Sequence, residues 1–224
     1  MIEDPWLAER LGRPVFTFEA GDEPDQLAAE VARRAPAFAQ AKVDCADVES
    51  TVALQEAGFR VVDVNITLSR PAAPGQPPGD VHESGDPDRA AVLDIAANHY
   101  DVSRFHRDPD IPEGLARRIK RDWAEALLDG TRGERLLVVR RGDRAVGFLG
   151  VLAPSPELHV IDLIAVHSAE RRSGAGRALV EALLASTGGR VAVGTQVANT
   201  GSLRFYERLG FEVEDTRFVL HLHA

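Results

Sequence analysis

The sequence predicts an α/β protein with a mixed central sheet flanked by helices, preceded by a smaller half of like topology. Strand-like and helix-like segments alternate along most of the 224 residues. Residues 158–166 form a nearly continuous apolar run, which is typical of a strand at the centre of a sheet. Four prolines fall within eight positions in residues 69–88, which favours a linker. We therefore expect a half-domain at 1–70, a linker at 71–86 and a main domain at 87–224.

The half-domain is predicted to alternate strands and helices. Asp47 can accept hydrogen bonds from the first turn of a helix, and Gly58 can end that helix. The residues after Gly58 are rich in β-branched side chains, which favour a strand. The expected strands lie at 14–19, 37–43 and 59–68, and the expected helices lie at 24–35 and 47–58.

The main domain is predicted to continue the same alternation. A β-hairpin is expected over 134–153, with its turn near Gly142. Leu115, Ile119 and Trp123 share one face of an amphipathic helix. The expected helices lie at 89–99, 113–128, 174–186 and 201–209, and the further strands at 158–166, 190–197 and 217–222.

A repeat links the two halves, because residues 56–68 align without a gap with residues 208–220. Two explanations stay open: either two helix–glycine–strand units resemble each other for physical reasons, or the half-domain is a duplicate. The first copy has Leu54 where the second has Tyr206, and the first has no glycine-rich loop. We therefore expect any chemistry to lie in the second half.

Composition excludes several classes of protein. The formal net charge of −9 argues against a sequence-independent nucleic-acid binder, which needs a basic face. The single cysteine, Cys45, excludes an internal disulfide, and a thiolate metal cluster is not expected. No apolar leader or run of about 18 apolar residues is present, so we expect a cytoplasmic protein without a membrane partner. The sequence is compatible with a homodimer but does not determine it.

A glycine-rich segment, RRSGAG at 171–176, lies between the apolar strand and an amphipathic helix. The first N–H groups of a helix lack internal partners and carry partial positive charge. Gly174 and Gly176 let the backbone approach a ligand, and arginines add positive charge, so this pattern predicts a pyrophosphate site. The alternative is that Ser173 caps the helix and the arginines are solvated.

The loop departs from the two common nucleotide templates, because no lysine follows it and no third glycine is present. Its spacing, R-x-x-G-x-G, resembles the acyl-CoA loop of the GCN5-related N-acetyltransferases. The segment VANTGSLRFYERLGF at 197–211 resembles the next motif of that family. The resemblance covers residues 86–223 and implies the acyl-CoA N-acyltransferase fold, with acetyl-CoA as the acyl donor and no metal.

The resemblance also implies roles for particular residues. The backbone of residues 164–166 would pair with the pantetheine arm, and the N–H groups of 171–176 would hold the pyrophosphate. Asn199 would contact the cofactor, and Tyr206 would protonate the departing thiolate, although Tyr206 is also compatible with a packing role. The implied cofactor-binding residues are Ile164, Ala165, Val166, Arg171, Arg172, Ser173, Gly174, Ala175, Gly176, Arg177, Asn199 and Tyr206.

The acceptor amine is the less determined part. Residues 101–112, DVSRFHRDPDIP, and the following helix with Trp123 resemble bacterial acetyltransferases of nucleotide-linked amino sugars, with those for TDP-fucosamine nearest. An ordinary surface loop is the alternative. Arg104, His106 and Arg107 offer cations to a diphosphate, and Phe105 offers a ring face. The implied substrate-binding residues are Ser103, Arg104, Phe105 and His106.

Other functions stay open at this stage. The base that deprotonates the amine is not determined; His99, His106, His159 and Asp162 are candidates, and alternation along the strand lets only one of His159 and Asp162 face a cleft. The acceptor can also be an amino acid, a peptide amine or an antibiotic. A carrier protein can replace CoA as the donor, and a non-catalytic acyl-CoA sensor is the rival outside catalysis.

Overall fold

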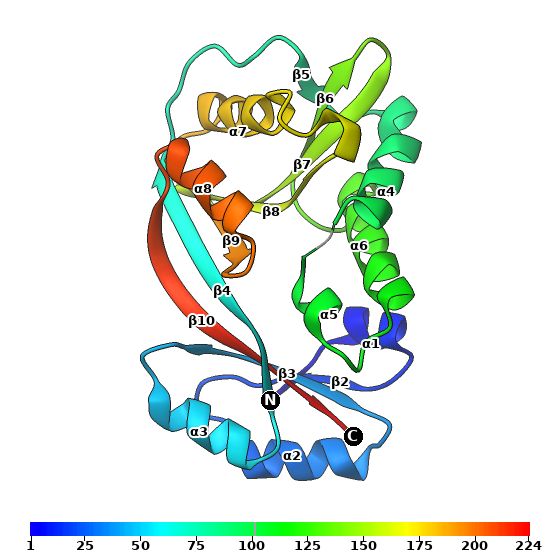
Figure 1. The fold of residues 1–224 in the computed structure, drawn as a ribbon, viewed down its shortest axis with the longest axis vertical. Helices are drawn as coiled ribbons and strands as arrows, with labels where there is room; N and C mark the ends of the chain where they lie inside the picture. Colours follow the sequence, from blue (N-terminus) through cyan, green and yellow to red (C-terminus); the bar gives the residue numbers. More distant parts are fainter. Residues whose placement is uncertain (101) are drawn as a thin grey trace.

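The computed structural model describes residues 1–100 and 102–224, and one ten-stranded mixed sheet runs through it. The strand order is β1-β2-β3-β10-β4-β9-β8-β7-β6-β5. Helices cover the sheet on both sides, and the sheet twists strongly from one end of the molecule to the other (Figure 1). The predicted α/β class with a mixed sheet flanked by helices is confirmed.

The first part of the chain forms short strands alternating with helices. Asp4 caps the first helix by accepting from the Leu7 N–H at 2.9 Å, and Asp47 caps a later one by accepting from the Ser50 N–H at 3.0 Å. The elements are β1 (Ile2–Glu3), α1 (Pro5–Leu11), β2 (Val15–Thr17), α2 (Pro24–Arg33), β3 (Phe38–Asp44), α3 (Val48–Glu56) and β4 (Arg60–Pro71).

The remaining chain forms the larger part of the sheet and the helices that cover it. The predicted hairpin is present, and Gly142 with its positive φ of 59° lies in its turn. The elements are β5 (Val81–Glu83), α4 (Arg89–Asn98), α5 (Arg104–Arg107), α6 (Glu113–Leu128), β6 (Arg135–Arg141), β7 (Arg144–Ser155), β8 (Leu158–Val166), α7 (Ala175–Ser186), β9 (Arg190–Gln196), α8 (Thr200–Arg208) and β10 (Glu212–His223).

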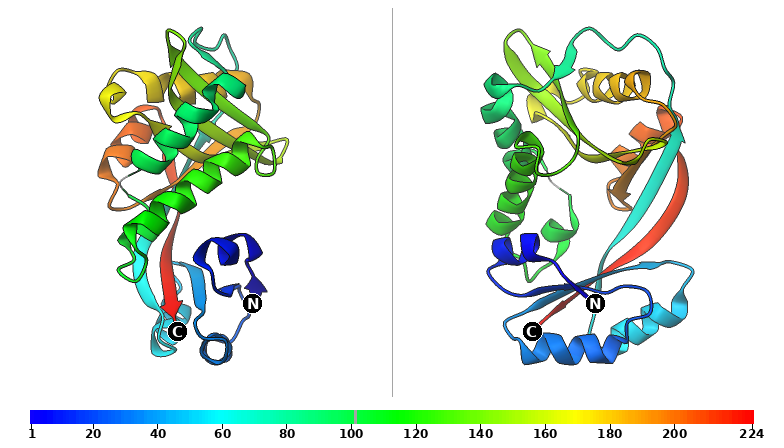
Figure 2. Two further views of the ribbon diagram at one scale, coloured as in Figure 1. Left: turned by 90° about the vertical axis from the view of Figure 1, so that its right-hand side faces the viewer. Right: turned by 180° about the vertical axis from the view of Figure 1, so that it is seen from behind.

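Two long strands join the halves of the chain. β4 pairs antiparallel with β9 and with β10, and β10 continues past β4 to pair antiparallel with β3. They run side by side as the long curved pair that connects the upper and lower parts of the molecule (Figures 1 and 2). These are the strands of the sequence repeat, so the two copies are neighbours in one sheet.

Apolar side chains from the sheet pack against helices on both of its faces. α7 and α8 cover one face, where Leu179 and Leu183 pack against Leu149 and Ile161 of the sheet. α4 and α6 cover the other face, where Phe148 is fully buried. α2 and α3 cover the N-terminal strands in the same way. Burial on both faces explains the continuous apolar pattern of the central strands.

Several elements were not predicted or have different bounds, among them β1, α5 and three others. The proline-rich segment 71–86 contains β5, which adds to the sheet edge by pairing with β6. The helix α1 has an N-terminal signal in Asp4 followed by Pro5, with Gly12 at its C-terminal end. β10 spans 212–223 instead of the predicted 217–222, because its extra residues pair with β4.

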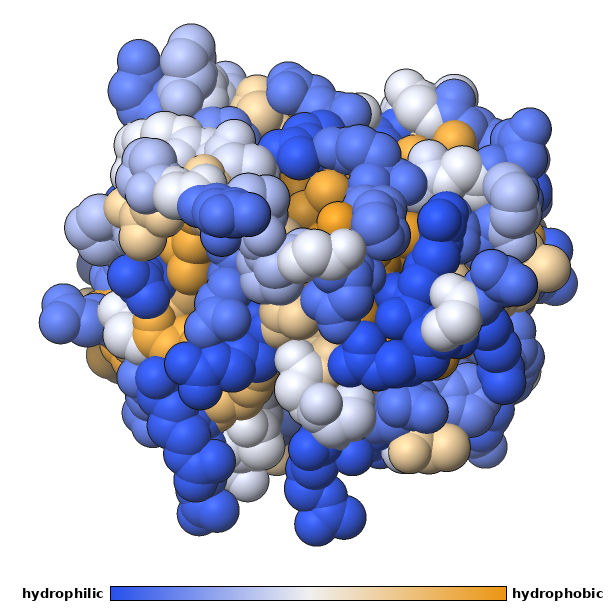
Figure 3. Space-filling view, turned by 90° about the horizontal axis from the view of Figure 1, so that it is seen from above, coloured by the Kyte–Doolittle hydropathy of each residue, from blue (hydrophilic) through white to orange (hydrophobic). Residues whose placement is uncertain are grey.

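The described part of the chain holds no helix that is both long and apolar enough to cross a membrane. Seen from above, the surface is mostly hydrophilic, and hydrophobic side chains show mainly in recesses between polar ones (Figure 3).

Gly189 allows β9 to begin against β8. Its φ is +65°, and a Cβ built on it would lie 2.3 Å from the carbonyl oxygen of Glu157, the group that accepts the Arg190 N–H at 2.8 Å. We expect Gly189→Ala to lower the free energy of unfolding by at least about 2 kcal/mol. Gly188→Ala is the matched control, because no atom lies within 4 Å of its Cβ position. Equal urea midpoints for the two variants would contradict this account.

Candidate active site

The parallel pairing of β8 with β9 is interrupted near the middle of the sheet. The strands pair only from Leu158 opposite Arg190 to Ile161 opposite Val193, although both strands continue. A β-bulge occurs at this point, since Leu163 and Ile161 pair with consecutive residues of β7 and Asp162 is the extra residue. A pocket of about 90 Å³ opens between the two strands. We call it the small pocket.

The interruption leaves the outer part of β8 without a strand partner on the β9 side. Ile164 lines the small pocket, and residues 164–166 line a neighbouring pocket that also includes Arg171. The Ile164 carbonyl accepts a hydrogen bond from the Tyr100 hydroxyl at 2.5 Å. The structure thus leaves this side of residues 164–166 open, and their pairing with an extended ligand stays a prediction.

The loop 171–176 presents unpaired backbone N–H groups at the start of α7. Within the described residues, the N–H groups of Arg172, Gly174 and Gly176 make no hydrogen bond. Arg172 has a φ of 66° and Gly174 a φ of 91°, so both adopt the left-handed conformation that turns this loop. This geometry fits a phosphate group at a helix N-terminus.

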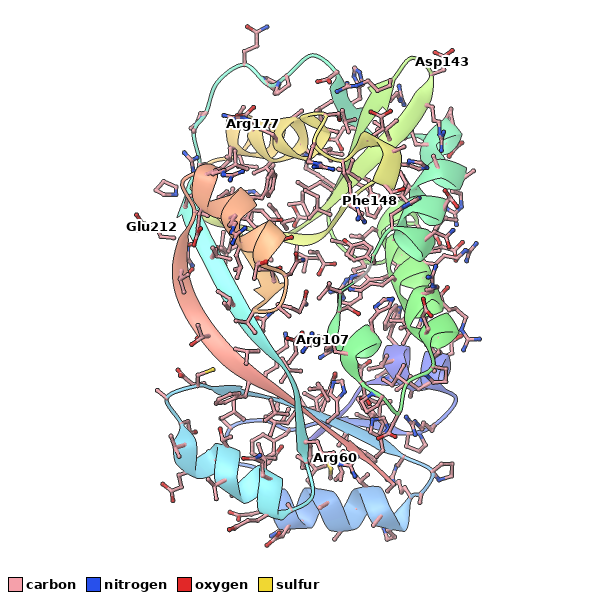
Figure 4. All side chains as sticks on the ribbon, viewed as in Figure 1. Arg60, Arg107, Asp143, Phe148, Arg177 and Glu212 are labelled. Atoms are coloured by element: carbon pink, nitrogen blue, oxygen red, sulfur yellow. The ribbon has the colours of Figure 1, made fainter. Side chains whose placement is uncertain are left out.

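Several side chains around the loop already form hydrogen bonds within the protein. Ser173 accepts a long hydrogen bond from the Ala175 N–H at 3.4 Å. Arg171 donates to the His99 carbonyl at 2.8 Å. Arg177 donates to Glu181 at 2.7 Å and lies on the exposed face of α7 (Figure 4). The loop thus offers its backbone more directly than its arginine side chains.

Tyr206 is buried at the base of the small pocket. Its ring is 3% exposed and contacts Phe205 and Phe211 edge to face. Burial raises the pKa of the Tyr206 phenol above its ordinary value, so the hydroxyl stays protonated at neutral pH. Asn199 caps α8 by accepting from the Ser202 N–H at 3.2 Å and also lines the small pocket.

A cavity of about 650 Å³ adjoins the small pocket. We call it the large cavity. Strands β3, β4, β8, β9 and β10 and helices α5 and α6 contribute to its lining, so both halves of the chain build it. Ile161, Val193 and Gly194 line both the large cavity and the small pocket. A ligand in the large cavity can therefore reach the opening between β8 and β9.

The large cavity holds more unpaired cations than unpaired anions. Its acidic side chains lie near arginines: Asp162 pairs with Arg132, and Asp63 is 3.7 Å from Arg107. The two others, Glu214 and Asp215, pair with Arg190 and Arg217. Three cations that line the cavity form no ion pair or hydrogen bond with the described residues: Lys42, Arg104 and Lys120.

The predicted acceptor-binding residues divide into two groups. Ser103 and Arg104 line the large cavity, as expected for a substrate contact. Phe105 also contributes to the cavity lining, but the residue is only 1% exposed and packs in an apolar cluster with Leu7 and Phe38, so its contact with the acceptor stays a prediction. His106 does not line the cavity, and its Nδ1 lies 2.7 Å from the Ser103 hydroxyl.

Arg107, the other cation of the segment 101–112, also does not line the cavity. It lies between α5 and β4 (Figure 4). Asp101, the first residue of the segment, lies outside the described residues.

The candidate bases also differ in whether they line the large cavity or the small pocket. Asp162 lines both the large cavity and the small pocket, whereas His159 lines neither, so the expectation that only one of them faces the cleft is confirmed. His99 lies near the loop, and its Nδ1 accepts from the Ser168 N–H at 3.3 Å. Neither the large cavity nor the small pocket has a histidine among its described lining residues.

A buried carboxylate in the segment 101–112 forms hydrogen bonds with the C-terminal strand, β10. Asp108 accepts hydrogen bonds from His221 at 2.6 Å and from His223 at 2.8 Å. The potential ligand atoms of these three side chains lie close enough together to hold a metal ion. The same is true of a second set, Asp94, His99 and His167. Arg13 lies 2.9 Å from the other ring nitrogen of His223, so the Asp108 group is explained by hydrogen bonding. We call it the Asp108 clamp.

The fold and site together define an acyltransferase of the acyl-CoA type: a sheet that opens beside a glycine-rich helix N-terminus, with a buried tyrosine at the opening. The acetyltransferase (GNAT) family model matches residues 95–211, and the chain belongs to this family. The predicted family, fold and enzyme class are confirmed, and the family uses an acyl-CoA donor.

Two relatives and one solved structure show the range of similar proteins. The dTDP-fucosamine acetyltransferase of Escherichia coli O6:H1 is 29% identical over 191 residues, which cover 81% of this chain and 80% of that protein. The spore coat polysaccharide biosynthesis protein SpsD of Bacillus subtilis is 27% identical over 143 residues, 60% of this chain. The match spans only 47% of SpsD. A tandem GNAT protein from the clavulanic acid biosynthesis pathway has a similar fold, with a TM-score of 0.55 at 12% identity over 89% of this chain and 68% of that one.

Sequence reasoning missed the two lysines of the large cavity. The chain contains only two lysines, Lys42 and Lys120, and both line this cavity. Their rarity among many arginines was the available signal. Arginine keeps its charge in almost any environment, whereas a buried lysine changes its pKa readily.

The Asp108 clamp makes stability depend on pH. Burial lowers the pKa of His221 from 6.5 to about 4, despite the opposing hydrogen bond to Asp108. A base whose pKa is lower in the folded state contributes stability above its unfolded pKa, and this is lost as the pH falls through the folded pKa. We therefore expect the free energy of unfolding to fall by up to about 3 kcal/mol between pH 6.5 and pH 4 through this residue.

Urea unfolding measured across this pH range tests the clamp. His221→Gln should flatten the dependence, because the amide can still donate to Asp108 but does not titrate. His82→Gln is the control, since His82 is exposed on β5. An equally steep loss of stability in the His221 variant would show that other groups cause it.

Proposed function

We propose that this protein transfers an acetyl group from acetyl-CoA to the primary amine of a nucleotide-linked amino sugar. The observation that carries the proposal is the large cavity with its unpaired cations, directly beside the opening between β8 and β9. Family membership supplies the reaction class. A relative named as a dTDP-fucosamine acetyltransferase supports the sugar acceptor, as does a relative named for polysaccharide biosynthesis.

The acyl donor would lie along the outer part of β8. The backbone groups of Ile164, Ala165 and Val166 would pair with the pantetheine arm, since β9 does not reach them. The N–H groups of the loop 171–176 would hold the pyrophosphate. Because Arg177 is paired with Glu181, its contribution would be the general positive charge near the helix N-terminus. Asn199 would contact the donor where the strands separate.

The reaction would proceed by direct attack of the amine on the thioester carbonyl. A backbone N–H of β8 at the bulge would stabilise the oxyanion, because the interruption leaves such groups without strand partners. Tyr206 would donate its proton to the sulfur as the thiolate leaves. The raised pKa of Tyr206 keeps this proton on the phenol until negative charge develops beside it.

The acceptor would place its diphosphate near Lys42 and Arg104. Arg104 is a cavity-lining cation without an ion-pair partner among the described residues, and its guanidinium can bind a phosphate by two parallel hydrogen bonds. Burial lowers the pKa of Lys42 to about 8, with Arg104 and Arg217 adding to the effect, so a bound phosphate would favour its charged form. Surplus positive charge inside a chain of net charge −9 fits an anionic acceptor.

Replacing Tyr206 by Phe tests the acid. The ring contacts with Phe205 and Phe211 are retained, so the fold should be unchanged by circular dichroism and thermal unfolding. We expect kcat to fall about 100-fold, the lower end of the usual contribution of a general acid. Thiol release from acetyl-CoA is the measurement, and turnover equal to that of the wild type would remove Tyr206 from the mechanism.

A panel of amines tests the acceptor. Acetyl-CoA is mixed with dTDP-linked amino sugars, the same sugars without the nucleotide, amino acids and aminoglycosides, and thiol release is followed. We expect turnover of the nucleotide-linked sugars and much weaker turnover of the free sugars, because the cavity cations would then lack their anion. Activity confined to amines without phosphate would overturn the sugar-nucleotide assignment.

Arg104→Gln is the matching variant. Loss of a charge-assisted hydrogen bond should raise the KM for the nucleotide-linked acceptor about 10–100-fold and leave the KM for acetyl-CoA unchanged. Arg144→Gln is the control, because Arg144 is exposed at the start of β7 and does not line the cavity. Equal acceptor KM values for Arg104→Gln and Arg144→Gln would contradict the role of Arg104.

A further inference from the structure

An alkylammonium cannot attack a thioester until it loses a proton. The amine substrate therefore needs a base near the small pocket. Two titratable side chains among the described residues line both the large cavity and the small pocket: Lys120 and Asp162. Asp63 lines only the large cavity. Tyr100 and Tyr206 line only the small pocket, and both are phenols whose pKa burial raises.

Asp162 is not available as a base. Its carboxylate accepts hydrogen bonds from Arg132 at 2.6 and 2.8 Å and from the Trp123 indole N–H at 2.7 Å. These three donors occupy both oxygens of the carboxylate. Asp162 therefore fixes the charge and the geometry of the bulge, and Lys120 is left as the group that can take a proton.

Lys120 lies where the large cavity meets the small pocket, and it has no carboxylate partner among the described residues. It lies on α6, is 8% exposed, and makes no hydrogen bond or ion pair with the described residues. Its Nζ lies 4.5 Å from the centroid of the Trp123 ring and 5.1 Å from that of the Tyr100 ring. The amine lies where the large cavity meets the small pocket. Contact with the two rings offsets only part of the cost of burying its positive charge.

The charges around Lys120 come from four neighbouring elements. Burial is the largest cause that lowers the pKa of Lys120, to about 7, and Arg104 on α5 adds to it. Arg132 after α6 and Lys42 on β3 act in the same direction, while Asp162 on β8 opposes them. A substantial fraction of the side chain is then a neutral amine at neutral pH.

We infer that Lys120 removes the proton from the acceptor ammonium. The inference rests on the proposed amine acetylation. Neutral Lys120 takes one proton from the acceptor nitrogen, and the freed lone pair forms the C–N bond at the thioester carbonyl. The C–S bond breaks as Tyr206 gives its proton to the sulfur. The nitrogen loses its second proton to the Tyr206 phenolate, and Lys120 later releases its proton to the solvent.

Direct titration of the two lysines tests this inference without any acceptor. Reductive methylation with ¹³C-formaldehyde labels Lys42, Lys120 and the chain terminus, and the variants Lys42→Met and Lys120→Met assign the signals. We expect the Lys120 signal to titrate near pH 7, well below the ordinary lysine value of about 10.4. Titration above about pH 9 would overturn the inference, because Lys120 would then be a permanent cation.

The pH dependence of kcat/KM supplies the second arm, with whichever amine the wild type acetylates best. We expect the rise of kcat/KM near pH 7 to disappear in Lys120→Met and in Lys120→Arg, with about 100-fold lower kcat/KM at pH 7. Lys42→Met is the matched variant: its acceptor KM should rise, and kcat/KM should still rise with pH, with a midpoint shifted slightly upward because one positive charge near Lys120 is lost. A wild-type profile in Lys120→Arg would overturn the inference, since arginine keeps the charge but is not a base.

The two proposals fail in different ways. If the best acceptor is an amine without a nucleotide, the sugar-nucleotide assignment is wrong, and Lys120 is still tested with that amine. If nucleotide-linked sugars are acetylated but Lys120 titrates as an ordinary lysine, the acceptor assignment holds and the inferred proton transfer is wrong.

Discussion

The end of the β8–β9 pairing is the constraint on which the rest of the site depends. Two parallel strands that stop pairing after Ile161 and Val193 leave backbone groups of β8 without strand partners in the middle of a buried sheet. Such groups require other partners. Tyr100 satisfies one of them at the Ile164 carbonyl, and residues 164–166 line the small pocket or its neighbour. The buried Tyr206 lines the same opening.

The surroundings of the opening keep it in place. The bulge at Asp162 shifts the register of β7 and β8, and Arg132 and Trp123 hold the Asp162 carboxylate from the α6 side. α7 packs on the other face of the sheet, so its N-terminus and the loop 171–176 lie at the end of β8. The hydrogen bonds to Asp162, the register shift between β7 and β8 and the packing of α7 therefore all act on the same part of β8.

The N-terminal half contributes to the site through the sheet as well as through packing. β4 inserts between β9 and β10, and β10 continues onto β3, so Lys42 and Asp63 become cavity-lining residues although they precede the family motifs by more than a hundred positions. The Asp108 clamp fixes the segment that carries Arg104 against the end of β10. The large cavity is thus a product of both halves, and the N-terminal half supplies part of its charge.

The sequence by itself determined the α/β class, nearly all of the elements and the acyl-CoA loop, because periodicity, caps and glycine positions are local properties of the chain. It also placed Tyr206 and Asn199 in a recognisable motif. It could not determine that Phe105 is almost fully buried in an apolar cluster while Arg104 has no ion-pair partner among the described residues, because both occupy one turn of a four-residue helix. Only the tertiary structure decided which cations lack partners, since Lys42, Arg104 and Lys120 come from β3, α5 and α6. Burial and charge pairing depend on distances between elements, which no local pattern in a sequence contains.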